Sequence, residues 1–138
     1  MRPTRSTRLL LLGLLAASAC RWGSRVERFP AATTPFGATM AIAGPDRRLL
    51  DGELLAATDS GLFVARQARV TFVPYATIAS ARVVGLDQAY MLARGRAPDA
   101  ERLARLRRVS RFPQGLNDDV LARLLRAHAQ DGVDRVQP

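Results

Sequence analysis

The hydrophobic and polar positions in the middle of the chain alternate over short runs that end in turn residues. From residue 37 to about residue 86, this pattern predicts β-strands. The expected strands are Ala38–Ile42, Leu49–Thr58, Leu62–Ala65, Val70–Val73 and Ala81–Val84. Strands of this length and spacing predict a small curled antiparallel sheet, or a partly open barrel, of about five strands.

Apolar residues recur at helical spacing from Pro98 onward. Leu103, Leu106 and Val109 lie three residues apart and form the apolar stripe of a first expected helix, over residues 98–111. We expect Pro98 to be the first helical residue, because the fixed φ of proline suits that position.

A second amphipathic helix is expected after Asn117, whose side chain suits an N-cap position. The leucines of this helix fall on one face with His128 at its edge, and Gly132 is expected to end the helix. A sheet followed by two amphipathic C-terminal helices predicts a single α+β domain over residues 37–138.

The first nineteen residues have the pattern of an export signal. Arg2, Arg5 and Arg8 precede an unbroken run of apolar or small residues, Leu9–Ala19. This run is too short to span a bilayer, which takes about 20 helical residues. A basic start, a short apolar run and a small-residue end are typical of a secretory signal peptide over residues 1–19.

The apolar run ends in Ala17-Ser18-Ala19-Cys20, which resembles the lipobox of bacterial lipoprotein signal peptides. The resemblance implies that Cys20 becomes the first mature residue and is acylated on its thiol and its amine. Arg21 follows Cys20, and the family reserves Asp at that position for retention in the inner membrane. In a host with two membranes, the resemblance therefore implies the outer membrane, facing the periplasm. Ala17-x-Ala19 is also an ordinary signal-peptidase site, and cleavage there would leave Cys20 unmodified.

The segment after Cys20 shows neither a strand period nor a helical period up to residue 36. It contains Gly23, Pro30 and Pro35, which are typical of linkers. We therefore expect residues 20–36 to be a lipidated Cys and a flexible tether between the membrane and the domain.

Positive charge is concentrated around the first expected helix. The formal net charge is +9, and all 21 basic residues are arginines. We expect Arg105, Arg108 and Arg111 to be able to contact anionic lipid headgroups or another polyanion. The alternative is a solvated helix face, as the i,i+4 spacing of Glu101 and Arg105 indicates.

A second basic group, Arg47 and Arg48, lies in the turn between the first two expected strands. The strand hairpins, the sequence Val73-Pro74-Tyr75 leading into Ile78, and a following helix resemble pleckstrin-homology and GRAM-type domains over residues 38–109. The resemblance implies that Arg47 and Arg48 occupy the position that binds phosphates in the phosphoinositide-binding members.

The residue types limit the chemistry that the chain can perform. One Cys and one His exclude a disulfide framework, a zinc cluster and any catalytic set that needs a second His. Walker, GxSxG and HExxH motifs do not occur. Asp51 and Glu53 lie two residues apart on one side of a strand, where they form either a carboxylate pair or, as the adjacent turn favours, part of a solvated rim.

The sequence therefore predicts an exported, membrane-anchored lipoprotein with a non-catalytic domain that binds or scaffolds a protein partner in the cell envelope. The alternative is a peripheral module that binds anionic lipid or another polyanion through residues 98–111. We expect no enzyme activity, no cofactor, no metal and no nucleic acid partner.

Overall fold

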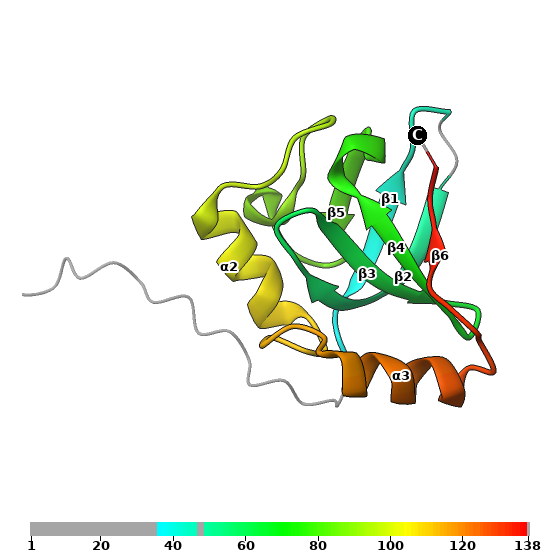
Figure 1. Cartoon of the computed structure of the whole chain (residues 1–138). Coiled ribbons are helices and arrows are strands. Elements are labelled where there is room, and N and C mark those ends of the chain that lie inside the picture. Colours follow the sequence, from blue (N-terminus) through cyan, green and yellow to red (C-terminus); the bar gives the residue numbers. More distant parts are fainter. Residues whose placement is uncertain (1–35, 47–48, 138) are drawn as a thin grey trace, which may run out of the picture. The chain divides into compact units, whose positions relative to one another are not determined.

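The computed structural model describes residues 36–46 and 49–137 of the chain. The strands are β1 (Thr39–Ala43), β2 (Leu49–Ala57), β3 (Gly61–Arg66), β4 (Arg69–Pro74), β5 (Ser80–Val83) and β6 (Asp134–Arg135). The helices are α2 (Ala100–Val109) and α3 (Asp118–Ala127), with 3-10 turns η2 (Tyr75–Thr77) and η3 (Gln88–Tyr90). Five strands thus precede two helices, and the α+β class is confirmed (Figure 1).

The sheet is open and mixed. Its strand order is β5-β1-β2-β3-β4-β6, and every neighbouring pair is antiparallel except β4 and β6. The sequence analysis missed β6, because two residues are too few to give an alternating pattern. A register shift between Leu54 and Ala56 forms an irregularity in β2 opposite β3, and such bulges bend a strand.

The first helix, α2, begins two residues after the proline that the sequence predicts as its first residue. The side chain of Asp99 accepts a hydrogen bond from the backbone N–H of Arg102 at 2.7 Å. Asp99 is therefore the N-cap, and Ala100 is the first residue of α2. The prediction that the helix starts at Pro98 is wrong by two residues.

The second helix has the predicted start and an earlier end. The Oδ1 atom of Asn117 accepts a hydrogen bond from the backbone N–H of Val120 at 2.8 Å, so the predicted N-cap is confirmed. The helix ends at Ala127, and Ala129 just beyond it takes a left-handed φ of 48°. The chain therefore leaves the helix before Gly132, and the prediction that Gly132 ends it is wrong.

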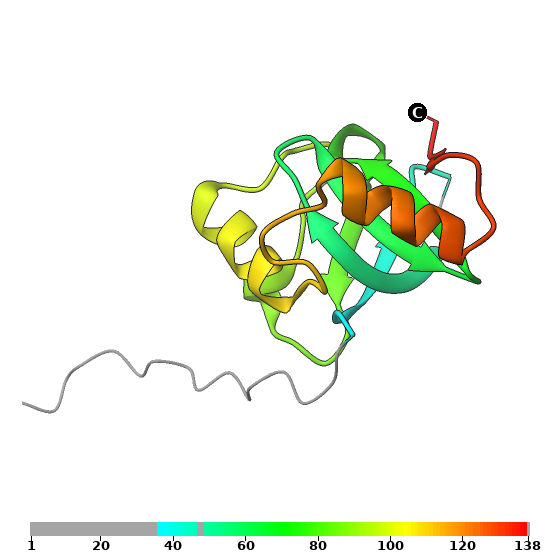
Figure 2. The same ribbon diagram turned by 60° about the horizontal axis from the view of Figure 1, so that its bottom comes forward.

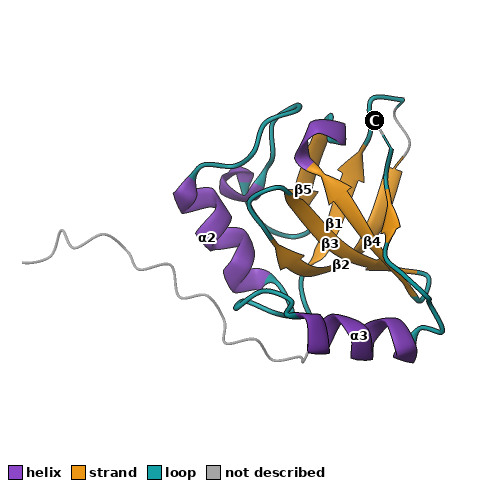
Figure 3. Ribbon diagram, in the orientation of Figure 1, coloured by secondary structure: helices purple, strands orange, loops and turns teal. Residues whose placement is uncertain are grey.

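The sheet buries side chains on both of its faces. One face and α2 enclose the main core, which consists of Met40, Ile42, Leu54, Ala57, Leu62, Val64, Val73, Tyr75, Ile78, Ala81, Val83, Tyr90, Leu92, Leu103 and Leu106. On the opposite face, Phe63 of β3 pairs across the strands with Phe72 of β4, and their ring centroids are 4.9 Å apart. The second helix, α3, lies over this face close to β4 (Figure 2 and Figure 3).

The edge of β4 that faces away from β3 is bonded in part to the side chain of Gln130, which lies just before β6 in the sequence. The Oε1 atom of Gln130 accepts a hydrogen bond from the backbone N–H of Val70 at 2.7 Å, and its Nε2 atom donates to the Val70 carbonyl at 3.0 Å. Gln130 is 8% exposed and Val70 is fully buried. These bonds satisfy backbone groups that an uncovered edge strand would present to other chains.

Candidate functional site

Two of the predicted sites lie outside the described residues. They are the acylation site Cys20, with the rest of residues 1–35, and the basic pair Arg47 and Arg48 between β1 and β2. The signal peptide, the tether and the phosphate-binding turn therefore stay predictions from the sequence.

The three arginines predicted to contact an anionic surface have different surroundings. The Nη2 atom of Arg105 lies 2.6 Å from Glu101 Oε1, which forms the i,i+4 pair that the spacing indicates. Arg108 is exposed on the last turn of α2. Arg111 lies beyond the helix end, with its Nη1 atom 3.6 Å from Glu53 Oε2. Carboxylates thus partly neutralise Arg105 and Arg111, which weakens their attraction to an anionic surface.

The chain enters the described domain beside the end of α2. The backbone N–H of Ala38 donates to the carbonyl of Val109 at 2.8 Å. The carbonyl of Ala38 accepts from the N–H of Leu54, also at 2.8 Å, and the N–H of Arg111 donates to the carbonyl of Leu54 at 3.0 Å. These bonds join the incoming chain, β2 and the segment after α2 at one place.

The side chain of Glu53 completes this junction. Its Oε1 atom accepts a hydrogen bond from the backbone N–H of Gly37 at 2.7 Å, and the Arg111 guanidinium lies 5.5 Å from the centre of the Phe36 ring. The interpretation of Asp51 and Glu53 as one solvated rim is wrong for Glu53, whose side chain is 20% exposed, and holds for the exposed Asp51. We call the junction the entry corner, formed by residues 36–38, Glu53, Val109 and Arg111.

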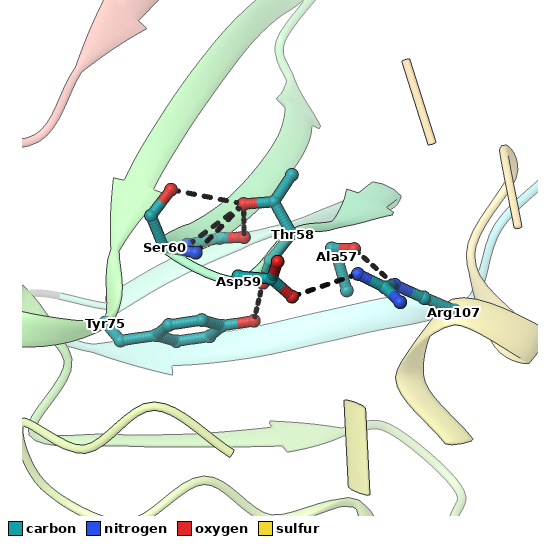
Figure 4. A network of polar contacts seen from close by, with 7 residues as sticks. Ala57, Thr58, Asp59, Ser60, Tyr75 and Arg107 are labelled. Carbon is teal, nitrogen blue, oxygen red and sulfur yellow. Dashed lines mark hydrogen bonds and ion pairs between the residues drawn. The ribbon is translucent and has the colours of Figure 1, made fainter. Parts of the chain in front are cut away.

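The turn between β2 and β3 is hydrogen-bonded to both α2 and η2 (Figure 4). The Nε atom of Arg107 donates to the carbonyl of Ala57 at 3.1 Å, and its Nη2 atom lies 3.1 Å from Asp59 Oδ1. The hydroxyl of Tyr75 donates to the carbonyl of Thr58 at 2.8 Å. Burial raises the pKa of Tyr75 to about 12, so its phenol is protonated at neutral pH and acts as a hydrogen-bond donor.

A cavity of about 400 Å³ lies between α3 and the outer face of β3 and β4, and we call it the α3 cavity. Its apolar lining consists of Phe63, Phe72, Leu121 and Val133, and its polar lining consists of Thr58, Ser60 and Arg135. This combination of apolar walls and a few polar groups is typical of small-molecule sites.

A second cavity, of about 510 Å³, lies beside the turn between β1 and β2. Its lining includes Asp46 from that turn, Arg66 from the end of β3, and Gln137 near the C-terminal end of the chain. The two charged residues have opposite signs, so the described part of this cavity shows no excess of positive charge for an anion.

Sequence reasoning missed the α3 cavity and the place of Arg135 in its lining. A signal for the cavity is present in β4, where Val70 and Phe72 point to one face while Thr71 and Val73 point to the other. Large apolar residues on both faces indicate a strand that is covered on both sides. No sequence signal indicates Arg135, because its position depends on a two-residue strand.

The described residues show neither a metal site nor a membrane span. No group of three or more His, Cys, Asp and Glu side chains among them is placed to hold a metal ion. None of the helices in residues 36–46 and 49–137 is long and apolar enough to cross a membrane. Comparisons with protein-family models, with curated proteins and with solved structures give no match. A functional assignment therefore rests on the residues of this chain alone.

Proposed function

We propose that the chain is an exported lipoprotein, anchored to a membrane by acyl groups on Cys20, whose α+β domain is a non-catalytic binding module in the cell envelope. The basic start, the short apolar run and the lipobox-like Ala17-Ser18-Ala19-Cys20 support export and acylation. More than one acyl chain makes such an attachment stable. In a host with two membranes, Arg21 supports the outer membrane as the destination.

The entry corner is the observation in the domain that supports attachment through the preceding chain. Its hydrogen bonds fix residues 36–38 to the end of α2, so a pull on the preceding chain acts at that place. Residues 21–36 reach at most about 50 Å when fully extended. An anchor at Cys20 therefore limits the distance between the membrane and the entry corner to about this length.

Membrane fractionation of a Cys20→Ala variant tests the anchor. We expect the unaltered protein to sediment with membranes and to resist release by salt, because acyl chains hold it by hydrophobic contact. The Cys20→Ala variant has no thiol to acylate and should move to the soluble fraction. Ser24→Ala, four residues further along, is the matched control and should sediment with the unaltered protein. Membrane attachment of Cys20→Ala that equals the unaltered protein would contradict the proposal.

A peripheral module that binds anionic lipid is the second candidate, and the exposure of Arg108 on the basic end of α2 favours it. The Cys20→Ala chain should then bind vesicles of anionic lipid, should not bind neutral vesicles, and should be released as salt is raised. Replacing Arg105, Arg108 and Arg111 together by Gln should abolish this binding. Absence of binding to anionic vesicles at low salt would exclude this candidate and leave the acyl anchor as the only membrane contact proposed.

A further inference from the structure

We propose that the α3 cavity binds a small amphiphile that carries one carboxylate on an apolar chain, which is the chemistry of a free fatty acid. The site is separate from the acyl anchor at Cys20. It rests on side chains of β3, β4, α3 and the C-terminal segment, so it stands whether or not Cys20 is acylated.

The apolar part of the cavity is already assembled. The Phe63 and Phe72 rings lie 4.9 Å apart with their planes tilted by 54°, and they form the floor on the outer face of the sheet. Leu121 lines the cavity from α3, and Val133 lines it from the segment before β6. No residue of α3 is fully buried, so the apolar face of the helix retains surface that a ligand can cover.

The volume suits a small ligand. At about 400 Å³, the cavity lies near the lower end of the range of roughly 300–1,000 Å³ that is usual for small-molecule sites. This size accommodates one short or medium acyl chain, and it is too small for the two chains of a phospholipid together with their headgroup.

In the part of the chain that the structure describes, the cation in the cavity has no acidic partner. Arg135 lies over the ring of Phe72, with its guanidinium carbon 5.1 Å from the ring centroid. Within residues 36–46 and 49–137, no carboxylate forms an ion pair with Arg135. The neighbouring carboxylate of Asp134 is bound instead to Arg69, through hydrogen bonds of 2.6 and 2.9 Å.

The carboxylate of Asp59, which adjoins the polar lining in the sequence, is also occupied. Asp59 lies between Thr58 and Ser60 in the sequence, and its Oδ1 atom pairs with Arg107. The Thr58 hydroxyl donates to the carbonyl of Gly61 at 2.9 Å, so its proton is already used. The hydroxyl of Ser60 is exposed, and with the Thr58 proton in use it can donate to Thr58 Oγ1 only over 3.4 Å. It can exchange this long contact for a hydrogen bond to a bound carboxylate.

A single cation beside aromatic and aliphatic walls selects among ligand classes. An uncharged apolar molecule would add no hydrogen-bond acceptor for Arg135, whereas a carboxylate on the same chain would pair with it through charge-assisted hydrogen bonds. A polyphosphate or a nucleic acid needs several cations, and the cavity lining contains one. One carboxylate on one apolar chain therefore matches both parts of the lining.

Titration of the folded protein with decanoate, decanol and acetate tests this site. The protein is the full chain with Cys20→Ser, so that no acyl group competes for the cavity, and decanoate is kept below the concentration at which it forms micelles. We expect saturable binding of one decanoate, weaker binding of decanol, and no binding of acetate. Calorimetry measures the affinities, and changes in the amide chemical shifts of residues 58–63, 70–73, 121 and 133–136 locate the bound ligand.

Three variants separate the charged and the apolar contributions. Arg135→Gln should weaken decanoate about tenfold or more and leave decanol unchanged, because it removes one charge-assisted contact. Leu121→Trp should fill the cavity and reduce the binding of both ligands at least tenfold. Arg126→Gln, an exposed arginine on α3 that does not line the cavity, is the matched control and should bind decanoate as the parent does.

The outcome decides the proposal in either direction. Absence of saturable decanoate binding by the folded parent would overturn it, as would unchanged decanoate affinity in a folded Arg135→Gln variant. Thermal unfolding of each variant shows whether it is folded. If Leu121→Trp fails to fold, Arg135→Gln and the comparison of decanoate with decanol still decide. None of these results depends on Cys20, so they distinguish a failure of this site from a failure of the membrane anchor.

Discussion

The side chain of Gln130 forms two hydrogen bonds with the backbone of Val70, which lies sixty residues earlier in the chain. The primary amide supplies one acceptor and one donor, as the next strand of a sheet would. Gln130 follows α3 closely, so these bonds also hold the end of that helix against β4. The Gln130 side chain therefore helps to attach the outer layer of the domain to the sheet, together with the pairing of β6 with β4.

Replacing Gln130 by Ala should lower the free energy of unfolding by about 1–3 kcal/mol, because buried backbone groups of Val70 lose their partners. Gln114→Ala is the matched control, since Gln114 is exposed in the turn before α3, and its effect should stay within about 0.5 kcal/mol. Chemical denaturation gives both values. Hydrogen exchange at the Val70 amide should accelerate in Gln130→Ala, and unchanged protection there would contradict the role of the amide.

The entry corner predicts a difference between two acidic residues on the same strand. Glu53→Ala removes the acceptor of the Gly37 N–H and the partner of Arg111, and it should lower the free energy of unfolding by about 1.5–3 kcal/mol. Asp51→Ala removes an exposed carboxylate and should change it by less than about 0.5 kcal/mol. Denaturation curves that show equal effects for the two variants would mean that Glu53 does not hold the incoming chain.

Strands β2 and β3 lie so close together at Gly52 that alanine fits there only if the backbone shifts. A Cβ atom at Gly52 would lie 2.5 Å from the carbonyl oxygen of Ala65 and 2.5 Å from a methyl carbon of Val64. We expect Gly52→Ala to cost about 1–3 kcal/mol of unfolding free energy. Gly132→Ala meets no atom within 4 Å, and its thermal midpoint should stay close to that of the unaltered chain. A Gly52→Ala variant as stable as Gly132→Ala would show that β2 and β3 do not approach each other in this way.

The phenol of Tyr75 predicts a loss of stability in alkali. Its pKa is about 12 in the folded chain and about 10 in an unfolded one, so the folded state holds the proton more tightly. The stabilisation of the folded state that comes from this raised pKa is fully present below pH 10 and is lost as the pH rises through 12. Tyr75→Phe should be less stable at pH 8 by about 1 kcal/mol, since the bond to the Thr58 carbonyl is lost.

The same variant should lose less stability than the unaltered protein between pH 10 and pH 12, because it has no phenol at position 75 to ionise. Unfolding by urea at pH 8, 10 and 11.5 measures the difference. Parallel declines of the two proteins over that range would indicate that Tyr75 titrates as an exposed tyrosine does.

Much of the fold could be predicted because its signals are local. The alternation in β4 and the cap at Asn117 involve residues that are close in sequence, so propensity and periodicity identify them. The end of α3 could not be predicted in this way. Ala129 takes a left-handed φ that alanine rarely adopts, and the nearby bonds of Gln130 to Val70 hold the chain in that place.

The candidate sites show the same difference between local signals and contacts of distant segments. The arginines of α2 and the pair of Arg105 with Glu101 could be identified from the sequence. The partners of Arg107 and Arg111 could not, since Asp59 and Glu53 lie far from them in the chain. The α3 cavity depends on β6, whose two residues carry no pattern. Contacts between distant segments therefore decide which charged side chains are paired and which face a ligand.

The intact mass of the protein recovered from the membrane fraction of cells that export it tests the central claim most directly. We predict a chain that begins at Cys20 and carries the added mass of two or three acyl chains. A chain that begins at Cys20 with no added mass would contradict the account, because the domain would then be exported without an anchor.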